Sequence, residues 1–441
     1  MTNVADLTVL GAGLAGTEAA WQAAQRGLVV DLFEMRPDRM TPAHQTGALA
    51  ELVCSNSFRG AGLHNAVGLL KEELRRCASL FMTIADKNAI PAGGALAVDR
   101  DRFALDMTEA ILSHPKIRLH RHEVVDIPTA GPVIIATGPL TSDKLAYQIG
   151  LLTGQDHLYF YDAIAPIIET DSIDRDQAFA ASRYGKGGAD YLNCPFDKDT
   201  YLAFVKQLCE GQTVLPHHFE KEVHFEGCLP IETLAKRGDM TLAFGPMKPV
   251  GLHDPRTGRP PFAVVQLRQD NRSASLYNMV GFQTKLTYPE QQRIFRTIPG
   301  LQNARFARFG SIHRNTFINA PHCLDDRLQL RSDSRIMFAG QITGVEGYVE
   351  SAACGFLAGL FAAWKHLEYP FCLPPPTTAF GSLLGHLAAE PANDFQPMNV
   401  TYGLFPPLDT RIKKRRDRRE ALALRALTDL ERWWARSASH R

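Results

Sequence analysis

Three glycines near the start of the chain have the spacing of a phosphate-binding turn. Gly11, Gly13 and Gly16 follow the apolar run Leu7–Leu10 and precede an Ala-rich stretch. In such a turn the first glycine permits a tight bend, the second lets a pyrophosphate approach the backbone, and the third lets a helix pack closely on the strand. Glu34 lies 18 residues after Gly16, where a carboxylate can accept hydrogen bonds from ribose hydroxyls. The pattern predicts a dinucleotide-binding site.

Two later glycine segments favour FAD as the bound dinucleotide. Thr137 and Gly138 follow the apolar run 132–136, and Gly340 and Gln341 precede a helix rich in Gly and Ala. These segments resemble the corresponding parts of flavoproteins with two dinucleotide-binding folds, although Gln341 replaces the usual acidic residue. We therefore expect FAD to contact the glycine turn, Glu34 and these four residues, with NAD(P)H as a transient reductant.

Cysteine spacing and composition exclude several classes of protein. The eight cysteines show no CxxC or CxxH spacing, which argues against a zinc site and a disulfide framework and for a reducing cytoplasm. With 45% hydrophobic and 22% charged residues, the chain has ordinary globular usage, not that of a disordered or coiled-coil protein. No apolar run approaches the roughly 20 residues of a membrane span, and we see no signal peptide. We expect a cytoplasmic protein without metal or membrane.

The charge is unevenly distributed along the chain. Residues 411–441 contain 11 Lys and Arg against 4 Asp and Glu, a net charge of +7, so residues 1–410 carry −6 within the total of +1. The cations gather in one dense cluster: Lys413, Lys414, Arg415, Arg416, Arg418 and Arg419. The cluster could contact nucleic-acid phosphates or form a solvated tail. Trp433 and Trp434 indicate that the tail docks on something, without indicating what.

The elements that must position these residues indicate an α/β fold. Short apolar runs predict buried strands at 7–10, 28–33, 132–136 and 334–339, with helices at 14–26 and 351–365. Between about 184 and 299 the pattern changes to short strands, helices and many turns. We predict a discontinuous FAD-binding Rossmann-like domain of the two-dinucleotide-fold type at 1–185 and 300–410. An inserted α+β domain at 186–299 and a basic helical tail at 411–441 complete the organisation.

Several longer motifs carry a resemblance to one family. They include GAGLAGTEAA (11–20), ELVCSNS (51–57), PAGGALAVDR (91–100), RYGKGGADYLNCP (183–195), FEGCLPIE (225–232) and AGQITGVEGYVESAACGFLAG (339–359). Over most of its length the chain resembles the folate- and FAD-dependent tRNA uracil-5-methyltransferases. The resemblance implies transfer of one carbon from 5,10-methylenetetrahydrofolate to carbon-5 of the T-loop uridine of tRNA, which forms 5-methyluridine. FADH2 would supply the electrons, and NAD(P)H would re-reduce the flavin.

The implied reaction needs two reactive side chains. Carbon-5 of uracil is a poor nucleophile until a thiolate adds to carbon-6, and the proton on carbon-5 must later leave to a base. Cys54 and Cys228 match the two functional cysteines of the family. We expect Cys228 to be the nucleophile and Cys54 the acid/base group, but the sequence leaves the reverse assignment open.

Further site residues follow from the matched motifs. Ser55, Asn56 and Ser57 could bind the flavin edge or cap a helix, and Tyr348 could cover the flavin ring or simply pack as an aromatic. Candidates for the folate are His313, Arg314, Asn315, Arg268 and Lys285. His313, Arg314 and Asn315 would contact the pterin ring of the folate. Arg268 and Lys285 would bind the glutamate carboxylates of the folate, although each of the five could instead be structural or solvated.

Different functions share part of this pattern. The same chemistry could act on ribosomal RNA, since only the RNA-facing surface would differ. A flavin-containing RNA-binding protein and a small-molecule oxidoreductase would also account for the dinucleotide site, but neither requires both cysteine motifs. We expect a monomer, while the choice between NADH and NADPH stays open.

Overall fold

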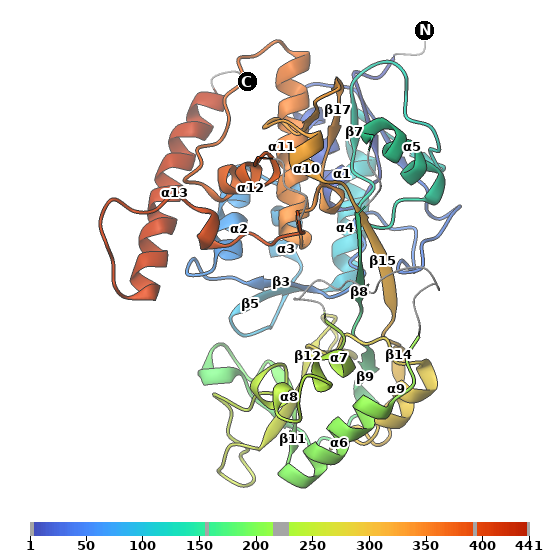
Figure 1. The fold of residues 1–441 in the computed structure, drawn as a ribbon, viewed down its shortest axis with the longest axis vertical. Coiled ribbons are helices and arrows are strands. Elements are labelled where there is room, and N and C mark those ends of the chain that lie inside the picture. The colour runs from blue at the N-terminus through green and yellow to red at the C-terminus, as the bar shows by residue number, and fades with distance from the viewer. Residues whose placement is uncertain (1–3, 155–157, 215–228, 391–394, 439–441) are drawn as a thin grey trace.

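The computed structural model describes residues 4–154, 158–214, 229–390 and 395–438, which form two units (Figure 1). The first unit contains both termini of the described chain, and the second lies below it in this view. The antiparallel strands β8 (Leu158–Ala163) and β15 (Ile312–Phe317) run between the two units. Among the described residues, no helix combines the length and apolarity needed to cross a bilayer.

The first unit is built on a six-stranded sheet. In spatial order its strands are β16 (Gln329–Leu330), β17 (Asp333–Phe338), β7 (Val133–Ile135), β1 (Leu7–Leu10), β2 (Val30–Glu34) and β6 (Ile117–Arg121). All neighbours pair in parallel except β16 with β17. Its central strands are nearly continuous apolar runs because a parallel sheet is covered on both faces. The four predicted strands all belong to this sheet.

Helices α1 (Leu14–Gln25) and α11 (Tyr348–His366) pack closely against each other. Two glycines of α11 make this approach possible. A Cβ atom at Gly355 would lie 2.1 Å from the carbonyl oxygen of Ala15, and one at Gly359 would lie 2.3 Å from that of Ala19. Any larger residue at either position would push the two helices apart.

The remaining elements of the first unit surround this pair. They are α2 (Ala66–Arg76), α3 (Leu80–Lys87), α4 (Arg100–Ser113), α5 (Asp143–Thr153), α10 (Ala320–Cys323), α12 (Ala379–Leu387) and a small sheet of β3 (Ser57–Gly60), β5 (Ala95–Val98) and β4 (Ala89–Ile90). Glu73 of α2 is fully buried and accepts hydrogen bonds from the backbone N–H groups of Ala379 and Phe380, at 2.7 and 2.9 Å. Burial nevertheless raises the pKa of Glu73 to about 8.

The second unit has its own sheet and its own core. The sheet is antiparallel, in the order β10 (Phe179–Ala180), β11 (Tyr191–Phe196), β12 (Ala263–Gln269), β13 (Leu276–Met279), β9 (Ile167–Glu169) and β14 (Phe306–Arg308). Helices α6 (Lys198–Glu210), α7 (Ile231–Ala235), α8 (Thr241–Phe244) and α9 (Tyr288–Phe295) accompany it (Figure 1). The described part of the segment 186–299 belongs to this unit, whose sheet also includes β9, β10 and β14.

The C-terminal helix α13 (Arg415–Ala438) packs on the first unit. Trp433 is buried, and its indole Nε1 donates a hydrogen bond to the carbonyl oxygen of Cys372 at 2.7 Å. The ring of Trp434 lies 5.8 Å from that of Phe356 in α11. The helix is therefore anchored by its C-terminal half, while the basic cluster lies at its N-terminal end.

Candidate functional site

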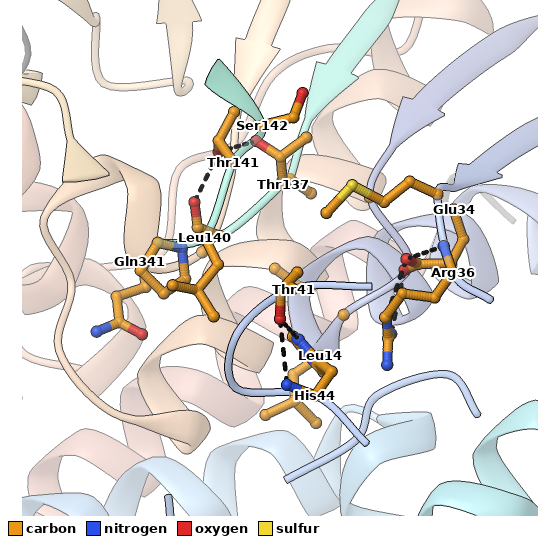
Figure 2. A pocket seen from close by; sticks show the side chains of 18 of the residues that line it. Leu14, Glu34, Arg36, Thr41, His44, Thr137, Leu140, Thr141, Ser142 and Gln341 are labelled. Carbon is orange, nitrogen blue, oxygen red and sulfur yellow. Dashed lines mark hydrogen bonds and ion pairs between the residues drawn. The ribbon is translucent and has the colours of Figure 1, made fainter. Parts of the chain in front are cut away.

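A pocket with an empty volume of about 1040 Å³ lies at the carboxyl ends of β1, β2, β7 and β17. In parallel sheets, ligands bind at this edge. The walls come from the glycine turn, from residues 33–36 after β2, from residues 136–142 after β7 and from Gly340 and Gln341 after β17. Figure 2 shows Glu34 and Arg36 on one side of the pocket, Gln341 on the other, and His44 between them.

The three glycines of the turn meet different surroundings. Gly11 has a φ of +91°, and a Cβ atom there would lie 2.7 Å from the carbonyl oxygen of Ala136. A Cβ atom at Gly16 would lie 1.7 Å from the carbonyl oxygen of Gly11, so the packing of helix on strand requires glycine. A Cβ atom at Gly13 would meet nothing within 4 Å, and this residue lines the pocket. Of the three glycines, only Gly13 therefore has open space beside its Cα atom that a ligand could occupy.

Glu34 is fixed at the pocket wall. Its carboxylate accepts a hydrogen bond from the N–H of Ala12 at 3.1 Å and forms an ion pair with Arg36 at 3.0 Å. Arg36 also pairs with Glu51 at 3.1 Å, and the three side chains are buried. The carboxylate is thus held at the end of β2, where the sequence places it, by four hydrogen bonds from Ala12 and Arg36.

Two polar segments complete the pocket. The hydroxyls of Thr137 and Thr141 lie 2.7 Å apart, and the amide of Gln341 donates to Glu346 at 2.8 Å. Sequence reasoning assigned no role to the loop after β2, which adds Arg36, Thr41, His44 and Glu51 to the pocket. The cluster of Thr, Pro and His in the segment TPAHQT (41–46) was the available signal. Burial, and then the charge of Arg36, lower the pKa of His44 to about 3.

Cys54 lies beside one end of this pocket. Its neighbour Val53 and the ring of Tyr348 both line the pocket. The hydroxyl oxygen of Tyr348 accepts hydrogen bonds from the backbone N–H groups of Cys54, at 2.7 Å, and of Ser55, at 3.3 Å. Burial, with the nearby charge of Asp162, raises the pKa of the Cys54 thiol to about 12. Cys54 is therefore a neutral thiol at physiological pH.

The residues after Cys54 are held by the second unit. Arg268 of β12 is buried, and its guanidinium donates to Asn56 Oδ1 at 3.0 Å and to Ser55 Oγ at 2.7 Å. The Asn56 amide nitrogen donates to the carbonyl oxygens of Val98 at 2.9 Å and Gln269 at 3.0 Å. The hydroxyl of Ser57 accepts from the N–H of Arg59 at 3.1 Å. These side chains fix the conformation of residues 54–56, the Cys54 loop.

A buried ion pair joins the two units next to this loop. Arg100, at the start of α4, donates to both carboxylate oxygens of Asp270 at 3.0 Å each. Its remaining terminal nitrogen donates to the carbonyl oxygen of Leu52. Arg100 and Asp270 are 8% and 2% exposed, which makes this contact part of the packing between the units.

His313 lies on β15, close enough to His44 of the pocket for their charges to interact. It is buried, pairs across the ladder with Asp162, and shares a hydrogen bond of 2.9 Å with the hydroxyl of Ser311. Burial, and then the charge of Arg308, lower the pKa of His313 to about 4, so the imidazole is neutral. Arg308 itself donates to the carbonyl oxygen of Ala43 at 2.9 Å, which connects β14 to the loop that lines the pocket.

The other predicted folate residues are placed differently. Asn315 is buried two positions after His313 on β15, whereas the side chain of Arg314 lies outside the described part. Lys285 lies in the second unit, where its N–H donates to Glu232 at 2.7 Å. Cys228, the predicted nucleophile, also lies outside the described residues. The structure thus shows where Cys54 and His313 lie, but it does not describe Cys228.

The basic cluster lies apart from this site. Its members are exposed, except for the half-buried Arg419, and none lines the pocket: Lys413, Lys414, Arg415, Arg416, Arg418 and Arg419. Arg416 forms an ion pair with Glu420 at 3.0 Å. Within the described residues no group of His, Cys, Asp and Glu could hold a metal ion.

Comparisons with known proteins give consistent matches. A family model described as glucose inhibited division protein A matches residues 6–370. A curated protein of Syntrophotalea carbinolica named methylenetetrahydrofolate--tRNA-(uracil-5-)-methyltransferase TrmFO is 68% identical over 434 residues, 98% of this chain and 95% of that protein. A protein of the same name from Geotalea uraniireducens is 62% identical over 428 residues, 97% of this chain and 98% of that protein. Among solved structures, GidA of Aquifex aeolicus in the form II crystal aligns with a TM-score of 0.71 and 16% identity, over 98% of this chain and 74% of that one. The last match confirms the predicted fold class.

Proposed function

The chain belongs to the methylenetetrahydrofolate--tRNA-(uracil-5-)-methyltransferase family, and from this premise we propose that it methylates carbon-5 of the T-loop uridine of tRNA. The one-carbon unit comes from 5,10-methylenetetrahydrofolate, and NAD(P)H returns the flavin to its reduced form. The observation that carries the proposal is the Cys54 loop, held by Tyr348 at the end of the dinucleotide pocket.

The pocket fits FAD. Gly13 leaves open space where a pyrophosphate would approach the backbone, and Glu34 is fixed at the end of β2 for the ribose hydroxyls. Thr137, Gly138, Gly340 and Gln341 line the pocket where the rest of the cofactor would lie. Reduced FAD supplies the two electrons that convert a methylene group into a methyl group.

The protonation of Cys54 supports its assignment as the acid/base group. The nucleophile that adds to carbon-6 must be a thiolate, and burial disfavours that form at Cys54. As a neutral thiol, Cys54 can donate its proton to the uracil ring when the nucleophile adds to carbon-6, and the thiolate so formed can then accept the proton that leaves carbon-5. Cys228, in the matched motif FEGCLPIE, is then the group that attacks carbon-6, and its attack makes carbon-5 able to accept the one-carbon unit.

The folate and the RNA approach from different parts of the molecule. The neutral imidazole of His313 and the amide of Asn315 offer polar groups for the pterin without an unpaired charge. Arg268 acts as a positioning residue for the Cys54 loop, because its guanidinium is already bonded to Ser55 and Asn56. The basic cluster at the start of α13 provides phosphate contacts for the tRNA.

A methylation assay tests the proposal. Purified protein receives unmodified tRNA transcript, methylenetetrahydrofolate and NAD(P)H, and nucleoside mass spectrometry reads the product. We expect 5-methyluridine from the wild type, none from Cys228→Ala or Cys54→Ala, and normal amounts from Cys209→Ala, a partly exposed free cysteine of the second unit. Product formed on ribosomal RNA but not on tRNA would refute the assignment of the substrate.

A further inference from the structure

Two neighbouring loops of the second unit expose aromatic side chains. Tyr184 lies in a short 3-10 turn (Arg183–Gly185) and is 66% exposed, and Phe244 ends α8 and is 81% exposed. The two loops are joined by hydrogen bonds. The N–H of Tyr184 donates to the carbonyl oxygen of Gly251 at 2.9 Å, and Arg183 donates to that of Val250 at 2.8 Å.

The backbone presents Tyr184 under strain. Its φ of +59° is a left-handed conformation that is unfavourable for a residue with a side chain. The ring covers Gly251, where a Cβ atom would come within 2.9 Å of it. The ammonium group of Lys186 lies 5.9 Å from the centre of the ring. The fold thus holds an aromatic ring and a cation together on the surface.

The two segments that carry these rings contain more cations than carboxylates. The exposed cations of the segments 182–188 and 236–259 are Lys186, Lys236, Arg237, Lys248, Arg256 and Arg259. These segments contain two carboxylates, Asp239, which is exposed, and Asp254, which is buried and paired with Arg256 at 2.6 Å. In a chain with a total charge of +1, this local excess selects an anionic partner.

This surface is connected to the Cys54 loop. Asp190, just after the first segment, accepts a hydrogen bond from the N–H of Gly93 at 2.7 Å, and the hydroxyl of Tyr191 donates to Ala92 at 3.0 Å. The chain continues from there into β5, which pairs with β3 at Ser57, three residues after Cys54. The first segment is therefore linked, through residues 92–93 and β5, to the strand that follows Cys54.

We propose that the RNA substrate makes a second contact with the protein, formed by Tyr184, Phe244, Lys186 and Lys248. This contact binds unpaired nucleotides of the RNA. Exposed aromatic rings stack on splayed bases, and interleaved cations hold the phosphates, a combination typical of single-stranded RNA recognition. A uridine presented for chemistry must leave its stack, and its unpaired neighbours need such support. The inference rests on the proposed function in taking the substrate to be RNA.

Binding of unmodified tRNA transcript tests this inference. The variants are Tyr184→Ala and Phe244→Ala, with Tyr147→Ala as the matched control, because Tyr147 is 65% exposed on α5 of the first unit. We expect each of the two variants to raise the Kd about 5- to 100-fold while the FAD content stays unchanged. The control should stay within about twofold. Lys186→Ala should reduce the slope of log K against log salt by about 1.

Three results would overturn the inference. Tyr184→Ala and Phe244→Ala that bind tRNA as tightly as the control would remove its basis, even if the wild type methylates tRNA and the proposed function stands. Variants that lose self-association in sedimentation but keep tRNA affinity would show that the surface joins two copies of this chain. A wild type that neither binds nor methylates tRNA would refute the proposed function and the inference with it.

Discussion

Removal of Asp270 should destabilise the protein far more than loss of an exposed carboxylate. In Asp270→Ala, Arg100 loses two hydrogen bonds of 3.0 Å and keeps its charge, because a guanidinium is not deprotonated in proteins. Arg100 is 8% exposed, so solvent cannot replace the lost partner without movement of the chain. Stranding a buried charge in this way costs about 3–5 kcal/mol of unfolding free energy, a large share of the total of about 5–15 kcal/mol.

Urea unfolding followed by circular dichroism measures this loss. The matched control is Asp171→Ala, which breaks an ion pair with Arg305 in the same unit, where the two side chains are 77% and 53% exposed. An exposed pair contributes much less than a buried one, because water screens its charges. Because Arg100 also bonds to the carbonyl of Leu52, the Cys54 loop should loosen as well, and the methylation rate should fall. Equal losses in Asp270→Ala and Asp171→Ala would refute the reasoning.

Three further predictions concern the cofactor turn, a buried acid and the C-terminal helix. Gly13→Ala should fold normally, but its dissociation constant for FAD should rise about tenfold or more, which flavin absorbance measures. Gly16→Ala should instead lower the unfolding free energy by about 1–3 kcal/mol or more, which urea unfolding measures. The folded pKa of Glu73 is raised to about 8, so its contribution to stability is present at low pH and is lost as pH rises from about 4.5 to 8. The unfolding free energy of Glu73→Gln should therefore rise relative to that of the wild type between pH 5 and 8, by up to about 1.4 kcal/mol per pH unit. A difference between the two proteins that does not change with pH would contradict this. Trp433→Phe removes the hydrogen bond to the half-buried carbonyl of Cys372 and should cost about 0.5–1.5 kcal/mol in the same assay.

Much of the dinucleotide site could be predicted from the sequence because it depends on local geometry. The spacing of Gly11, Gly13 and Gly16 fixes one turn between a strand and a helix, and Glu34 follows at the end of the next strand. The apolar runs for β1, β2, β7 and β17 are short, but they are clear enough to be recognised as buried strands.

The contacts around Cys54 could not be predicted in the same way because they join distant segments. Arg268 is 212 residues from Asn56, and no local pattern indicates that its guanidinium braces this loop. Arg268 was expected at the folate because a lone cation in a matched motif suggests an anionic ligand. The pairing of Arg100 with Asp270 likewise spans 170 residues. Such pairs depend on how the two units pack.

The pocket residues after β2 were missed for a different reason. Arg36 and His44 lie in an irregular loop, where neither helical nor strand periodicity indicates which side chains face inward. Their role becomes visible only when the loop folds back over the end of the sheet.

The origin of the transferred carbon tests the central claim most directly. Methylenetetrahydrofolate labelled with carbon-13 in its methylene group would be given to the protein with unmodified tRNA and NAD(P)H, beside a parallel reaction with labelled S-adenosylmethionine. The account predicts 5-methyluridine that is one mass unit heavier from the folate reaction and no product from the other. Label that enters only from S-adenosylmethionine would contradict it.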